Sequence, residues 1–222
     1  MILQGLVGPS VNTDGSYPAQ RMGKLGDVIA SELHGRFYEQ VSRGNVFSTG
    51  SSITALSANT ISLTATTTPI VGVYNPVTSG VNLVILQAMC YAMANTVTTP
   101  VGPGVLVWAS SINNSAITTG SSPFNRRTMA YTGSQAKGFP GGVALTGLTN
   151  NLVVFEAGDF STITPVTYGT VANTAIIPGF GGVQNFDGSL FVPPGGVLAL
   201  LNTTSSTTFS ATSRLLWEEV PV

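Results

Sequence analysis

The sequence predicts an all-β protein, an antiparallel β-sandwich preceded by an extended, partly helical N-terminal arm. Apolar and hydroxyl residues alternate along short segments of the chain, which is the pattern of half-buried strands. Gly, Pro and Asn separate these segments at close intervals, as in sandwiches and barrels. No helical pattern occurs between the expected strands, so an alternating βαβ architecture is excluded.

The distribution of charge divides the chain into two parts. Eight charged residues lie in the first 43 positions, and no charged residue follows until Arg126. We therefore predict an N-terminal arm at residues 1–48 and a β-sandwich body at residues 49–222. Turn-forming pairs indicate coil in the first twenty residues. Apolar residues at helical spacing then predict a short helix from Asp27 to Val41.

The body contains nine expected strands. They are Ser52–Ser57, Asn59–Ala65, Ile70–Tyr74, Val81–Met93, Val105–Ala109, Leu152–Glu156, Leu190–Val192, Val197–Leu201 and Thr207–Trp217. The segment Val81–Met93 is apolar on both faces, so we expect it to be buried on both, in the core or under a partner subunit. Residues 110–142 are irregular, and loops of that length usually serve function or contact. We expect residues 193–196 to form a rigid turn that sets the direction of the next strand.

Composition excludes several classes of function. Charged residues make up 8% of the chain and the formal net charge is −1, so the basic surface of a nucleic-acid-binding protein is missing. The single cysteine excludes an internal disulfide. With one histidine and one cysteine we expect no metal site and no cofactor. We also expect no membrane insertion, because no apolar run approaches the length of a membrane helix.

Few residues are available for catalysis. His34 is the only histidine, and the sequence contains no Gly-x-Ser-x-Gly motif for it to serve. Cys90 lies in an apolar strand, where a cysteine usually behaves as a small hydrophobe. Carboxylate pairs can hydrolyse glycosidic bonds, and the sequence offers two such pairs. Glu156 with Asp159 is typical of a solvated turn. Glu218 with Glu219 is typical of a solvated terminus, with the two side chains on opposite faces. We therefore expect no enzymatic activity.

Four short segments of the chain are similar to segments of a known group of proteins. They are Leu33–Gln40, Arg43–Ser48, Val192–Leu200 and Trp217–Pro221. Together they resemble small structural proteins of tailed bacteriophages, a group that includes head decoration and cement proteins. The resemblance implies a virion structural protein with a jelly-roll-like sandwich that forms trimers on the capsid.

The expected function is therefore that of a non-enzymatic capsid decoration protein, which binds and reinforces the phage head. Such a protein would be made in the cytoplasm of the bacterial host and end in the virion. Its expected partners are its own copies, in a homotrimer, and the major capsid protein or another virion protein, with no nucleic acid and no membrane. The alternative is a tail or fibre protein that contacts another virion protein or a host glycan. The aromatic candidates for a glycan-binding face are Trp108, Phe124, Tyr131 and Phe139, although aromatic residues in sandwiches more often belong to the core.

The arm is expected to make the main contact with the rest of the particle. Interface energy concentrates in aromatic and arginine residues, so we single out four of them as partner-contact residues. They are Arg36, Phe37, Tyr38 and Arg43. The alternative is that the arm packs on its own body. The pair Arg126–Arg127 could also meet an acidic partner, although a solvated loop is the favoured interpretation.

Overall fold

The structure is a computed structural model, and its described residues are 5–6, 20–21, 35–55, 66–94, 106–113, 116–158, 160, 179–202 and 209–222. The chain divides into two compact units, Met1–Glu39 and Gln40–Val222. In the first unit, two short strands pair in parallel, β1 (Gly5–Leu6) with β2 (Gln20–Arg21). Helix α1 (Tyr38–Arg43) begins in this unit and ends in the second. The expected helix from Asp27 shares only its last residues with α1, and its positions 27–34 lie outside the described residues.

The boundary between the units differs from the one drawn from charge. The second unit begins at Gln40, and its first long strand begins at Val46, before the predicted boundary after residue 48. Phe47 is buried and pairs with Trp217 in the sheet. Charged residues indicate which part of a chain is exposed to water, and here the last charged residue of the arm, Arg43, lies only three positions before the strand that begins at Val46.

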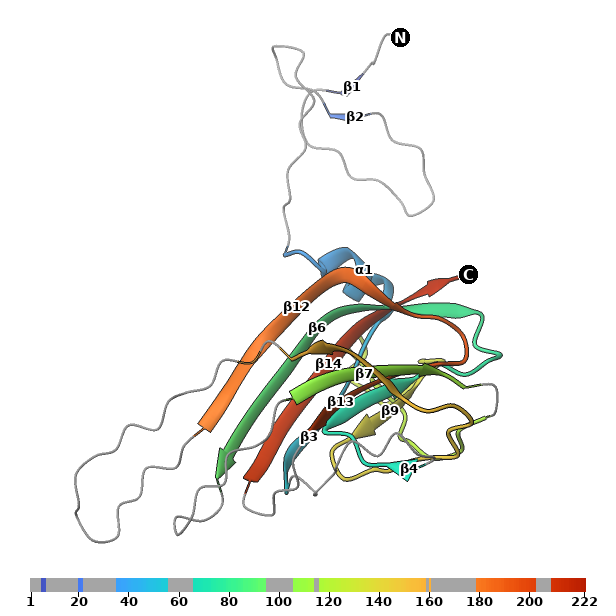
Figure 1. The fold of residues 1–222 in the computed structure, drawn as a ribbon. Helices are drawn as coiled ribbons and strands as arrows, with labels where there is room; N and C mark the ends of the chain where they lie inside the picture. Colours follow the sequence, from blue (N-terminus) through green and yellow to red (C-terminus); the bar gives the residue numbers. More distant parts are fainter. Residues whose placement is uncertain are drawn as a thin grey trace, which may run out of the picture. The chain divides into compact units, whose positions relative to one another are not determined.

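Eight strands of the second unit form the sandwich. In chain order they are β3 (Val46–Ala55), β5 (Val71–Tyr74), β6 (Val81–Ala94), β7 (Leu106–Ile112), β11 (Val153–Ala157), β12 (Gly179–Val192), β13 (Gly196–Asn202) and β14 (Phe209–Pro221). One sheet has the order β12-β6-β14-β3, and the other has the order β11-β7-β13-β5 (Figure 1). All neighbouring strands are antiparallel.

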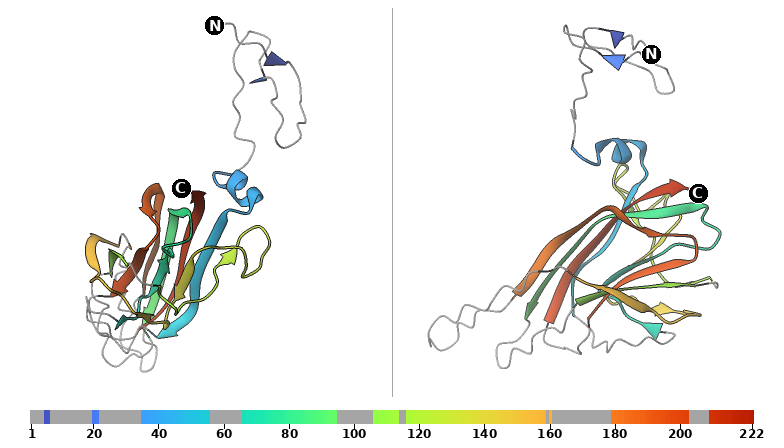
Figure 2. Two further views of the ribbon diagram at one scale, coloured as in Figure 1. Left: turned by 90° about the vertical axis from the view of Figure 1, so that its right-hand side faces the viewer. Right: turned by 45° about the horizontal axis from the view of Figure 1, so that its top comes forward.

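This order is that of a jelly roll. The first of the eight strands pairs with the eighth, the second with the seventh, the third with the sixth and the fourth with the fifth. Such pairing arises when one long antiparallel ribbon folds over itself, which gives two packed sheets built from Greek keys. Figure 2 shows the two layers of strands from two further directions. The predicted fold class, a jelly-roll-like antiparallel sandwich, is confirmed.

Most expected strands are present with shifted ends. The strand predicted at Ser52–Ser57 belongs to β3, which starts six residues earlier, and the strand predicted at Asn59–Ala65 lies outside the described residues. The C-terminal strand β14 occupies the middle of its sheet, between β6 and β3. Its inward-facing residues Ala211, Leu215 and Trp217 are therefore part of the sandwich core.

A long connection (residues 113–152) joins β7 to β11. It contains β8 (Phe124–Asn125), β9 (Lys137–Pro140) and β10 (Leu145–Thr146). Strand β8 pairs with β3, β9 pairs with β5, and β10 pairs with the short strand β4 (Thr66–Thr67). The connection thus extends both sheets at their β3 and β5 edges, which would otherwise present unpaired backbone groups to the solvent.

The second unit has two apolar cores. One lies between the sheets and contains Trp108 and Trp217. The other lies between the outer face of the β5-β13-β7 sheet and the long connection, and it contains Phe139 and Leu145. Every residue of β13 is buried as a result. The expectation that β6 is buried on both faces is wrong for the single chain, because its outward-facing Tyr91 is 42% exposed.

The turn between β12 and β13 lies where the sequence predicts it, with Val192 ending one strand and Gly196 beginning the next. Gly195 has φ +81°, a conformation that favours glycine. The buried side chain of Asn75 donates hydrogen bonds to the carbonyl oxygens of Val81 (2.7 Å) and Val192 (2.9 Å). One amide therefore ties the turn to the β5–β6 corner.

Candidate functional site

Among the residues that the structure describes, the groups considered for catalysis do not assemble into a site. His34 and Asp159 lie outside the described residues. Cys90 is fully buried, and burial raises the pKa of its thiol to about 12, so the reactive thiolate is absent at neutral pH. Within the described ranges, no three His, Cys, Asp or Glu side chains gather closely enough to hold a metal ion. No helix in that same part of the chain has the length and apolar character to cross a membrane.

The three described carboxylates of the predicted pairs have separate structural settings. Glu156 is exposed on β11 and accepts a hydrogen bond from the Gln184 side chain (3.0 Å). Glu218 and Glu219 do point to opposite faces of β14. The expectation that both are solvated is wrong for Glu219, which is 7% exposed and accepts hydrogen bonds from the backbone N–H groups of Gln135 and Ala136 in the long connection.

The predicted partner-contact residues lie around α1. Arg36, Phe37 and Tyr38 belong to the first unit, and Arg43 belongs to the second. The Arg36 guanidinium lies 5.7 Å from the centre of the Phe37 ring, within cation–π range. Tyr38 is 50% exposed, and Arg36 and Arg43 are exposed as well. These residues offer aromatic and cationic contacts, and their role as a partner surface stays a prediction.

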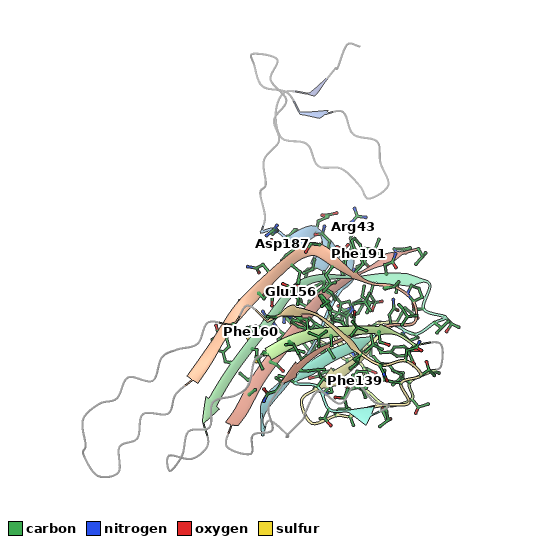
Figure 3. The ribbon with its side chains drawn as sticks, viewed as in Figure 1. Arg43, Phe139, Glu156, Phe160, Asp187 and Phe191 are labelled. Carbon is green, nitrogen blue, oxygen red and sulfur yellow. The ribbon has the colours of Figure 1, made fainter. Side chains whose placement is uncertain are left out.

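Two of the four aromatic residues considered for a glycan-binding face are in the core. Trp108 is fully buried, and its indole N–H donates to the Gln184 side chain (2.8 Å). Phe139, in β9 of the long connection, is fully buried and lies away from the exposed Phe191 of β12 (Figure 3). In contrast, Tyr131 is 69% exposed and Phe124 is half-buried, with their rings edge to face at 5.3 Å.

Phe124 and Tyr131 line a groove of about 490 Å³ on the outer face of the β12-β6-β14-β3 sheet. Strands β3, β14 and β6 provide its floor, and the long connection provides its wall. The lining residues are Ser48, Thr49, Gly50, Met89, Ser121, Ser122, Phe124, Tyr131, Pro140, Thr212, Ser213 and Arg214. The groove thus combines an aromatic wall, several hydroxyl groups and one cation, and we refer to it as the outer groove.

Arg214 is the charged residue of the outer groove. Its Nη2 donates to the Oε1 atom of Gln87 (2.8 Å), and Gln87 in turn donates to the side chain of Asn185 (2.9 Å). Burial, and secondly the charge of Arg126, lower the pKa of the Arg214 guanidinium. The described part of the chain offers Arg214 no ion pair. Arg214 is the only charged residue in the strand predicted at Thr207–Trp217, and this isolated charge is the feature of the sequence that could have indicated the groove.

A second surface lies at the edge opposite to the long connection. There β11 and β12 form the outer strands of their sheets, and among the described residues each pairs with one neighbour only. All five residues of β11 are exposed. Large apolar side chains are exposed along both strands, and we call them the apolar edge: Val153, Val154, Phe155, Val183 and Phe191.

Comparisons with protein-family models, with curated proteins and with solved structures found no match to this chain.

Proposed function

We propose that this chain is a non-enzymatic structural protein of a tailed-bacteriophage virion, a head decoration protein that assembles as a homotrimer and binds the major capsid protein. The resemblance supports the virion assignment. Jelly rolls occur in viral capsid proteins and also in lectins and cupins, so the fold is compatible with this function without implying it.

The observation that carries the proposal is the apolar edge. Native proteins usually protect an outer strand with charged side chains, proline or a covering segment. The β3 and β5 edges have such a cover in the long connection, whereas β11 presents Val153, Val154 and Phe155 to the surface. Large apolar side chains exposed together along an outer strand, as on β11, are typical of a protein interface. We infer that further copies of the chain cover this edge in the particle.

The position of the resembling segments adds a second argument. Val46 and Phe47 of one segment pair directly with Glu218 and Trp217 of another, across β3 and β14. Phe47 and Trp217 are both buried. The resemblance therefore rests on residues that pack together and determine the fold.

The test measures the oligomeric state of the purified full chain by light scattering at micromolar concentration. We expect a trimer for the natural sequence and a monomer for each of the single variants Val153→Lys and Phe191→Lys. Met129→Lys is the matched control, because Met129 is 68% exposed but lies in the turn after β8, beyond the opposite edge. A monomeric natural chain, or equal dissociation by the control, would contradict the proposal.

The location in the virion needs a separate measurement. A decoration protein is present in many copies per particle, whereas a tail or fibre protein is present in few. Quantitative gel analysis of purified virions distinguishes the two. A low copy number would favour the alternative, a tail or fibre protein, and would leave the oligomer interface standing.

A further inference from the structure

The outer groove has the chemistry of a saccharide-binding site. Tyr131 offers an exposed ring, held edge to face by Phe124. A sugar ring packs its apolar face against such an aromatic ring, and ligand sites generally combine apolar surface with a few placed polar groups. The hydroxyl groups of Ser121, Ser122 and Thr212 border the same groove and match the hydrogen-bonding capacity of sugar hydroxyls.

The charge in the groove specifies the saccharide further. Arg214 uses Nη2 for Gln87, and its Nε atom is buried with no hydrogen-bond partner. Arg214 as a whole is half-buried, and a cation that loses part of its hydration is usually paired with an anion. Arg126 adds a second positive charge close enough to act on Arg214. A carboxylate bound in the groove would neutralise this uncompensated charge and accept hydrogen bonds from a planar donor group suited to it.

We propose that the outer groove binds a carboxylated saccharide, a sugar that carries a uronic or sialic acid group, with the carboxylate on Arg214 and the sugar ring against Tyr131. The groove is distinct from the apolar edge, since β3 and β14 form its floor whereas β11 and β12 form the edge. Its volume of about 490 Å³ lies in the range of small-ligand sites. The inference therefore does not depend on the oligomeric state or on the position in the virion.

The experiment uses the full chain and two matched pairs of probes. Methyl β-glucuronide is compared with methyl β-glucoside, and sialyllactose is compared with lactose, by saturation-transfer NMR and titration. We expect binding of at least one acidic sugar, about tenfold or more tighter than its neutral counterpart, because the charge-assisted hydrogen bonds are lost in the neutral sugar.

Three variants locate the site. Arg214→Gln and Tyr131→Ala should each weaken binding of the acidic sugar by about tenfold or more. Arg127→Gln removes the same charge from an exposed position outside the groove lining and should leave binding unchanged. A thermal unfolding curve for each variant shows that it is folded before its binding is measured.

Several outcomes would overturn the proposal. These are the absence of binding for both acidic sugars, equal binding of the neutral sugars, and an equal loss for Arg127→Gln. A Glu-rich peptide that binds as tightly as the sugars would instead identify the groove as a site for an acidic protein segment, and the saccharide proposal would be wrong.

Discussion

Glu218 and Glu219 are adjacent in the sequence and have different roles in the fold. Glu219 faces inward, where the Gln135 N–H donates to its Oε2 atom (3.0 Å) and the Ser134 hydroxyl donates to Oε1. Glu218 faces outward and is half-buried. The sequence predicts the opposite directions from strand geometry alone. It cannot predict the burial of Glu219, because the groups that cover this carboxylate lie more than eighty residues away in the chain.

We predict that Glu219→Gln lowers the free energy of unfolding by about 2–3 kcal/mol, because hydrogen bonds to a buried charged group are lost and an amide N–H₂ would face backbone donors. Urea denaturation followed by tryptophan fluorescence measures this, since Trp217 lies two residues away in the core. An unchanged midpoint would show that the carboxylate does not hold the long connection in place.

Glu218→Gln is the matched control and has its own dependence on pH. Burial raises the pKa of the Glu218 carboxyl above its ordinary value of 4.5, so the fold disfavours its ionised form. Well below pH 4.5 the Glu218 carboxyl is protonated in both the folded and the unfolded chain, so the substitution does not change stability through charge. As pH rises past it, the penalty for ionisation appears in the natural chain. The Glu218→Gln variant should therefore be as stable as the natural chain at low pH and more stable than the natural chain at neutral pH.

At the scale of elements, the long connection is a structural part of the sandwich. The sequence shows it only as an irregular segment, because its strand pairings, β8 with β3, β9 with β5 and β10 with β4, join distant parts of the chain and leave no local pattern. Trp108 shows a related limit. Its strand is apolar on both faces, so alternation does not indicate which face meets the core between the sheets. Strand positions could thus be predicted, whereas partners and faces could not.

We predict that Phe139→Ala destabilises the protein by about 3–5 kcal/mol, because it removes a fully buried ring from the core beneath the long connection. Tyr131→Ala, in the same connection, should cost less than about 1 kcal/mol, since its ring is 69% exposed and has one edge-to-face contact. Thermal unfolding of both variants provides the measurement. Equal losses would mean that the two rings share one environment, contrary to the structure.

At the scale of the whole molecule, the candidate sites differ in how far the sequence reveals them. The outer groove joins side chains from β3, β6, β14 and the long connection, so it exists only in the folded chain. Tyr131 and Phe124 could be nominated as aromatic residues, but the same reasoning nominated the buried Trp108 and Phe139. The apolar edge follows from the jelly-roll order, which among the described strands places β11 and β12 at the outer ends of the two sheets.

The division into two units leads to a prediction about the arm. Removal of residues 1–39 leaves all strands of the sandwich intact, together with the hydrogen bonds from Asn125 Nδ2 to the Gly44 oxygen (2.9 Å) and from the Glu219 N–H to the Asn45 oxygen (2.9 Å). We therefore expect residues 40–222 to fold alone, with a β-type circular dichroism spectrum and cooperative unfolding. A deletion that extends to residue 48 should unfold the chain, because it removes Phe47 from the core and opens the pairing of β3 with β14.

Particle binding then separates the arm's role from folding. If residues 1–39 of the arm carry the main contact with the capsid, residues 40–222 should fold yet fail to associate with virions from which the protein has been removed, as measured by co-sedimentation. The variant Arg36→Ala with Tyr38→Ala in the full chain should weaken association in the same direction, because aromatic and arginine side chains supply most interface energy. Undiminished binding of the truncated chain would assign the contact to the sandwich instead, where the apolar edge and the outer groove are the surfaces to test next.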